Sequence, residues 1–156
     1  MKNYNYAGRR FPRGPPAHFY GDFQMKQKRV WIYTRFRGDI DQRAAQKARL
    51  LQDAMEHDYT VVGCSTDEAD DYILYRPGLR ATLRAVRKGE VDAVMVTRVM
   101  NISHGPNRLL YVMKKLQNDG AILMAGGTDV EKELAEMGIA KDLRDRAQRK
   151  RLALPW

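Results

Sequence analysis

The chain has 156 residues, which is enough for one domain with a sizeable hydrophobic core and too few for two full domains. Apolar residues make up 44% of it and charged residues 30%, and no apolar run approaches the ~20 residues of a membrane-spanning helix, so we expect a soluble protein with no membrane partner. The formal charge of +9 favours a polyanionic partner, and the single cysteine excludes an internal disulfide and fits a cytoplasmic location.

The first 28 residues predict an arm without a fold of its own. They mix arginine, proline, glycine and aromatic residues with neither a strand period nor a helix period. Seven basic residues precede position 30 against one acid, Asp22; they are Lys2, Arg9, Arg10, Arg13, Lys26, Lys28 and Arg29. Aromatic side chains interleaved with basic ones can stack on bases or bind a nucleic-acid backbone, and they can equally dock on a partner subunit.

From residue 29 onward, short apolar runs alternate with segments of helical period. Strands are predicted at 29–35, 59–64, 91–97 and 121–125, and helices within 39–58, 76–90 and 105–120. In the first helical segment the apolar residues at helical spacing are Ile40, Ala44, Ala48, Leu51 and Ala54 or Met55. Single helices between strands indicate right-handed βαβ units. We therefore predict an α/β three-layer fold with a central, mostly parallel sheet of four to five strands in a flavodoxin-like order.

The segment after the last predicted strand is short and becomes basic toward its end. Two helical pieces are expected there, separated near Gly138, and they lead into a tail with five cations against Asp145: Arg144, Arg146, Arg149, Lys150 and Arg151. We predict three parts for the whole chain. These are a basic, aromatic-rich arm at 1–28, an α/β domain at 29–125, and a short, helical, basic extension at 126–156.

In an open parallel sheet, ligands bind beyond the carboxyl ends of neighbouring strands, where the strand order reverses. Three loops should meet there, at 34–38, 65–71 and 97–107. None contains a glycine-rich phosphate-binding motif, so neither a cofactor nor a small-molecule substrate is indicated. His104 has no ligand-spaced Cys or His, and the acidic run at 67–71 is expected to be a solvated loop, so no metal is predicted. Cys64 ends an apolar strand, and we expect a buried structural thiol there.

Two motifs suggest a family. The first predicted strand ends in Tyr33-Thr34-Arg35-Phe36-Arg37, and the sequence Arg-Pro-Gly-Leu opens the helix at 76–90. Residues 29 to about 124 resemble the catalytic domain of serine recombinases of the resolvase/invertase family. The resemblance implies a resolvase-type strand order and, in active members, site-specific DNA recombination through a phosphoserine intermediate. The family's Tyr-x-Arg-Val-Ser motif places Arg37 at the position of the nucleophilic serine.

The resemblance extends to further positions, some of them matched and some replaced. Gln46 matches a glutamine on the family's first helix, and Thr66-Asp67 matches its Thr-Asp after the second strand. Arg76 matches the arginine that contacts the scissile phosphate, although Tyr75 replaces the acid before it. The final motif, Leu-Asp-Arg-Leu-Gly-Arg, aligns with Val-Met-Asn-Ile-Ser-His. Its aspartate and its two arginines are therefore replaced by Met100, Asn101 and His104.

These replacements predict a domain that cannot cleave DNA by the family mechanism. Arginine has five N–H donors, no lone pair and a pKa above ~12, so Arg37 cannot attack phosphorus. Asn101 is neutral, and histidine with its reference pKa of ~6.5 is mostly uncharged at pH 7. Thr34 should point to the opposite face of the sheet, and nothing positions Ser103 as a nucleophile.

The arginines that remain suggest phosphate binding instead of cleavage. Arg35, Arg37 and Arg76 are the candidate contacts for a phosphate or DNA, because arginine forks bind phosphate without cleaving it. Tyr33, Gln46 and Asp67 are supporting family matches. The alternative for Arg37 is drift, with an ion pair to Asp39, Asp67 or another loop acid.

Three hypotheses for the function follow, in order of preference. The first is a catalytically inactive resolvase-like protein that binds DNA, through sequence-independent contacts, or a recombinase partner, as an accessory or regulatory factor; self-association is compatible with it. The second is an active recombinase with a non-standard active site. The third is a protein-binding adaptor whose basic ends meet an acidic partner. The extension at 126–156 is too short to supply a helix-turn-helix domain as well as the family's long dimerisation helix.

Overall fold

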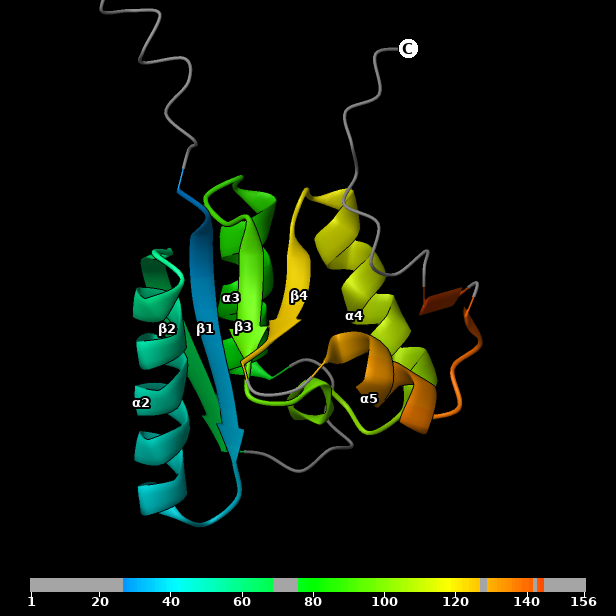
Figure 1. Ribbon diagram of the computed structural model, residues 1–156, viewed down its shortest axis with the longest axis horizontal. Helices are drawn as coiled ribbons and strands as arrows, with labels where there is room; N and C mark the ends of the chain where they lie inside the picture. Colours follow the sequence, from blue (N-terminus) through cyan, green and yellow to red (C-terminus); the bar gives the residue numbers. More distant parts are fainter. Residues whose placement is uncertain (1–26, 69–75, 127–128, 142, 145–156) are drawn as a thin grey trace, which may run out of the picture.

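Four parallel strands form the centre of the fold in the order β2-β1-β3-β4 (Figure 1). The structure is a computed structural model that describes residues 27–68, 76–126, 129–141 and 143–144. The strands are β1 (Arg29–Phe36), β2 (Thr60–Glu68), β3 (Ala93–Val96) and β4 (Ile122–Ala125). The predicted α/β fold with a parallel sheet is confirmed. Most of the N-terminal arm, part of the acidic run and most of the basic tail lie outside the described residues.

Helices connect the strands and cover both faces of the sheet. They are α2 (Ile40–Glu56), α3 (Pro77–Arg87) and α4 (Pro106–Asn118), followed after β4 by the short α5 (Val130–Glu136). The chain moves from β1 to one neighbour, β2, and then returns past β1 to β3 and β4. Because such crossovers are right-handed, this reversal places α2 on one face and α3 and α4 on the other. Figure 1 shows this arrangement of the helices.

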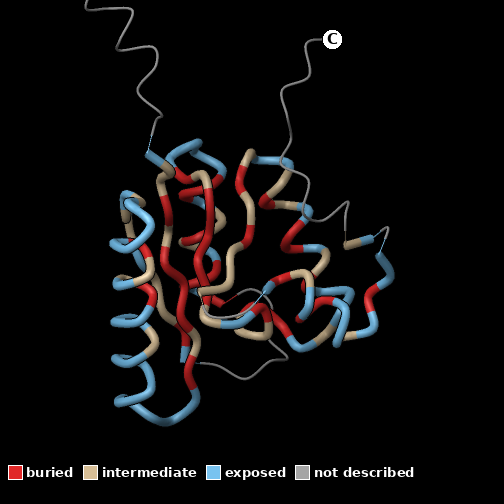
Figure 2. The backbone as a smooth tube through the Cα atoms, in the orientation of Figure 1, coloured by how far each residue is buried: buried red, intermediate tan, exposed pale blue. Residues whose placement is uncertain are grey.

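The hydrophobic core has two parts, one on each face. The larger part lies under α3, α4 and α5, and the smaller part lies under α2. β1 and β3 supply both parts, because alternate side chains of a strand point to opposite faces. Val30 and Ile32 face α2, while Tyr33 faces α3, and all three are fully buried. Figure 2 shows burial along most of β1 and β3.

Helix α3 begins and ends where the sequence indicates. Pro77 occupies its first turn, where the missing N–H costs nothing, and Lys88 is its C-cap. Gly89 follows with a φ of +76°, a left-handed conformation that glycine adopts without strain. Within the described residues, no helix has the length and apolar character that crossing a bilayer requires.

The packing face of α2 agrees with the apolar spacing in its sequence only near its C-terminal end, where Leu51 and Ala54 pack on the sheet. Its buried residues are Leu50 and Ala54, whereas Ile40 is 76% exposed and Met55 is 80% exposed. The N-terminal half of α2 is largely exposed (Figure 2). Cys64 is also exposed, which corrects the expected buried thiol. β2 is an edge strand, so its side chains are less covered than those of a central strand.

The orientation of α2 predicts which of its apolar residues stabilise the fold. Leu50→Ala removes a fully buried side chain and should lower the free energy of unfolding by about 2–5 kcal/mol. Ile40→Ala, on the exposed half of the same helix, should change it by less than about 0.5 kcal/mol. Urea denaturation of both variants measures the difference. Equal losses would mean that α2 packs through the face suggested by sequence spacing.

Candidate functional site

The candidate site lies at the carboxyl ends of β1, β2 and β3, where the strand order reverses. Arg35 and Asp67 are paired neighbours on β1 and β2. The chain after β3 forms a 3-10 turn, η1 (Val99–Asn101), and returns to the same end of the sheet. Arg35 donates a hydrogen bond to the carbonyl oxygen of Met100, so it links β1 directly to η1. The described parts of the three predicted loops therefore meet here.

A buried network joins Tyr33, Asp67 and Arg76 at this end of the sheet. The Tyr33 hydroxyl donates to Asp67 Oδ2 at 2.9 Å and accepts from Arg76 Nε at 3.0 Å. Arg76 Nε lies 3.7 Å from the same carboxylate oxygen, and none of the three residues is more than 5% exposed. Burial raises the pKa of Tyr33 above its ordinary value; the Asp67 charge adds to this shift, and Arg76 opposes it.

Asp67 also determines where α3 begins. Its two oxygens accept hydrogen bonds from the backbone N–H groups of Gly78 and Leu79, at 2.7 and 2.8 Å. Helix N-termini leave such N–H groups unpaired, and a carboxylate is favoured there by the helix dipole. A Cβ at Gly78 would lie 2.7 Å from the carbonyl oxygen of Thr66 and 2.8 Å from Asp67 Cγ, so glycine permits this close approach.

Two arginines bind successive carbonyl oxygens of the loop after β3. Arg76 Nη2 donates to Asn101 at 3.2 Å and to Ile102 at 2.7 Å, while Arg35 Nη2 donates to Met100 at 2.9 Å. Arg35 Nη2 also lies 3.3 Å from His104 Nδ1. Arg76 is 1% exposed, and its Nη1 atom is buried without a hydrogen-bond partner in the described part of the chain. These two arginines therefore hold the loop in place.

The other predicted site residues occupy different positions. Arg37 lies just beyond β1 and is exposed. The Asn101 side chain turns back to donate to Thr97 Oγ1 at 2.6 Å, so it does not join the buried network. Gln46 is half-buried on α2, and its Oε1 atom is buried without a hydrogen-bond partner in the described chain. A shared contact point of Arg35, Arg37 and Arg76 for a phosphate remains a prediction.

The hydroxyl groups near the site have internal partners. Thr34 is buried and shares a 2.8 Å hydrogen bond with Thr66, on the α2 face, as strand alternation predicts. Ser103 is 1% exposed, and its Oγ atom accepts the N–H of Gly105 at 3.1 Å. No group of three His, Cys, Asp or Glu side chains suited to a metal ion occurs within the described residues.

Sequence reasoning missed Glu133, which supports the loop from the side of α5. Its side chain is 4% exposed, and its Oε2 atom accepts the N–H of Val99 at 2.9 Å and lies 4.0 Å from Arg98 Nε. The only signal in the sequence is one glutamate in a short helical piece, which surface exposure explains equally well. Its role depends on α5 packing beside η1 (Figure 1).

The family model for the resolvase N-terminal domain matches residues 30–140. The chain belongs to the resolvase family. Comparison with curated proteins gives no match. The resolvase-type strand order suggested by the sequence agrees with this membership, and the match includes α5 as well as the predicted domain at 29–125.

Solved structures of serine recombinase domains share the fold of this resolvase-family chain. The catalytic domain of ISC1926 TnpA, an IS607-like serine recombinase, is 23% identical with a TM-score of 0.60 over 69% of this chain and 75% of that one. The catalytic domain of TP901-1 integrase is 20% identical with a TM-score of 0.60, over 76% and 97%. A site-specific recombinase from Streptococcus pneumoniae is 21% identical with a TM-score of 0.57, over 78% and 86%.

The raised pKa of Tyr33 predicts how stability depends on pH. The folded state keeps its proton at a pH where an unfolded tyrosine, with a pKa of ~10, releases it, so Tyr33 stabilises the fold below pH ~10 and less at higher pH. We expect Tyr33→Phe to make the fall in melting temperature above pH ~10 shallower. Tyr111→Phe, at a 44% exposed position, should leave that fall unchanged. Identical pH profiles for both variants would contradict the role of Tyr33.

Proposed function

We propose that this resolvase-family chain is catalytically inactive and acts as an accessory or regulatory factor that associates with DNA or with a recombinase. The observation that carries the proposal is Arg37, which stands at the position of the family's nucleophilic serine. A protonated guanidinium has no lone pair with which to form a phosphoester. In other enzymes, loss of the nucleophile from a coupled catalytic set lowers the rate on the order of a millionfold.

The loop after β3 supports the same conclusion. At the family's aspartate and first arginine stand Met100 and Asn101, whose main-chain carbonyls accept hydrogen bonds from Arg35 and Arg76. The Asn101 side chain is engaged by Thr97, and His104 stands at the second arginine position. A phosphorane transition state develops negative charge that fixed cations stabilise. Two of the family's cations are replaced here.

Replacement of the serine by another hydroxyl finds little support at the described site. Thr34 and Ser103 are buried and engaged with Thr66 and Gly105. Tyr33 is buried with a raised pKa, which disfavours the phenolate that would attack phosphorus. Each of these hydroxyls therefore has a structural role that a nucleophile would have to abandon.

DNA is the partner that charge and family membership favour. The formal charge is +9, and the basic residues gather in the N-terminal arm and the C-terminal tail. Such contacts neutralise phosphates without reading bases, so the association would be independent of sequence. Arg35, Arg37 and Arg76 are the candidate phosphate contacts at the sheet end. No metal or cofactor enters this proposal, and a cytoplasmic location fits it.

Covalent trapping tests the loss of catalysis. The wild-type protein, incubated with a nicked suicide DNA substrate, should form no protein–DNA adduct on a denaturing gel. Arg37→Ser should also form none, because Asn101 and His104 still replace the two family arginines. An active serine recombinase in parallel serves as the positive control. A wild-type adduct would show an active enzyme with a non-standard active site and would refute the proposal.

Salt titration tests the association with DNA. The affinity of the wild-type protein for a duplex should fall steeply between 50 and 200 mM salt, with about 0.9 added to the log–log slope for each phosphate neutralised. The measurement is fluorescence anisotropy of labelled duplexes of unrelated sequence. Absence of binding at 50 mM salt, or an affinity indifferent to salt, would remove the DNA partner and favour a protein-binding adaptor.

A further inference from the structure

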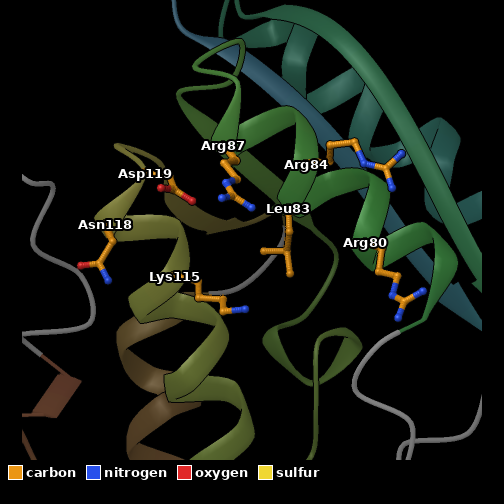
Figure 3. A pocket seen from close by; sticks show the side chains of 7 residues that line it. All are labelled: Arg80, Leu83, Arg84, Arg87, Lys115, Asn118 and Asp119. Atoms are coloured by element: carbon orange, nitrogen blue, oxygen red, sulfur yellow. The ribbon is translucent and has the colours of Figure 1, made fainter.

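A basic groove lies between α3 and α4, apart from the sheet-end site. Its volume is about 490 Å³. The side chains that matter for its chemistry are Arg80, Leu83, Arg84 and Arg87 from α3 and Lys115 and Asp119 from α4 (Figure 3). Four cations and a single acid therefore line the groove. Figure 3 shows Leu83 and Arg87 turned toward Lys115 across the gap, with Arg80 toward the other end of α3.

The three arginines of α3 are available to an external anion. The side chains of Arg80, Arg84 and Arg87 form no hydrogen bond or ion pair with any part of the chain that the structure describes, and all three residues are exposed. Helix-dipole stabilisation accounts for cations in the last turn of α3, where Arg84 and Arg87 lie. It does not account for Arg80, near the start of the helix, where the dipole disfavours positive charge.

The spacing of the arginines suits a linear polyanion. Residues three or four apart share a helix face, and a rise of 1.5 Å per residue places Arg80, Arg84 and Arg87 along a row of about 10 Å. A DNA strand carries a phosphate about every 3.4 Å along the helix axis. The row is therefore long enough to contact more than one phosphate of a strand, whereas a single small anion would use only part of it.

We propose that the α3–α4 groove binds the phosphate backbone of DNA as a second contact surface. The inference rests on the proposed association with DNA and assigns to it a place that the sheet-end arginines do not occupy. Arg76 precedes α3 and Arg87 ends it, so the 11 residues of α3 place Arg87 about 16 Å from Arg76 along the helix axis. Long charged side chains contact phosphates without base readout, so this surface contributes affinity independent of sequence.

A charge-matched pair of variants tests the groove. The groove variant is Arg80→Gln/Arg84→Gln/Arg87→Gln, and the control is Arg43→Gln/Lys47→Gln/Arg49→Gln on exposed positions of α2, which covers the opposite face of the sheet. Both lose three charges. We expect the groove variant to lower the slope of log affinity against log salt by up to about 2.7, at about 0.9 for each lost contact. The control should lower it by less than one contact.

The outcomes separate failure of the groove from failure of the proposed function. Thermal melting first establishes that both variants keep the wild-type fold. Equal loss of slope in the two variants, or no loss in either, overturns the groove while DNA association stands. Absence of wild-type binding to DNA overturns both. If the groove variant keeps its DNA affinity but loses binding to poly-glutamate that the wild type and control retain, the groove takes an acidic protein instead, and the DNA assignment is wrong.

Discussion

The carboxylate of Asp67 is the group on which the rest of this structure depends. It accepts the hydroxyl of Tyr33 on β1 and two N–H groups at the start of α3, while Arg76 lies beside it. A buried carboxylate without such partners would cost several kcal/mol, so these segments are stable only together. With Arg76 held in this way, its Nη2 atom donates to the carbonyl oxygens of Asn101 and Ile102 and positions the loop after β3.

These contacts bear on what can be inferred from the arginines that match the family. Arg35 and Arg76 occupy positions that belong to the catalytic site of active relatives by resemblance, yet here they bind main-chain carbonyls of the loop. Removing Arg76 would leave the buried carbonyl of Ile102 without this donor, at about 1–3 kcal/mol. An arginine with such a structural role is needed whether or not the protein cleaves DNA. The presence of both is therefore no argument for cleavage, whereas the replacement at Arg37 argues directly against it.

The sequence predicted the fold because its signals were local and repeated. Alternating apolar runs and helical segments specified four parallel strands, and Pro77 and Gly89 marked the limits of α3. The packing face of α2 was only partly predictable in this way, because alanines such as Ala44 and Ala48 carry little burial information.

The location of the candidate site was predictable from the sequence, but only some of its contacts were. Family resemblance selected Tyr33, Asp67 and Arg76, which do form one network. It gave no sign that arginines would bind carbonyl oxygens, because every residue has a carbonyl and sequence cannot rank them as acceptors.

Cleavage of DNA requires a coupled set of side chains, so replacement of one of them removes nearly all of the catalytic rate. Binding to a phosphate backbone sums over separate cations, so it survives the loss of any one. The proposed function is consistent on this ground, because a resolvase fold without cleavage could still hold DNA through charges that lie elsewhere on its surface.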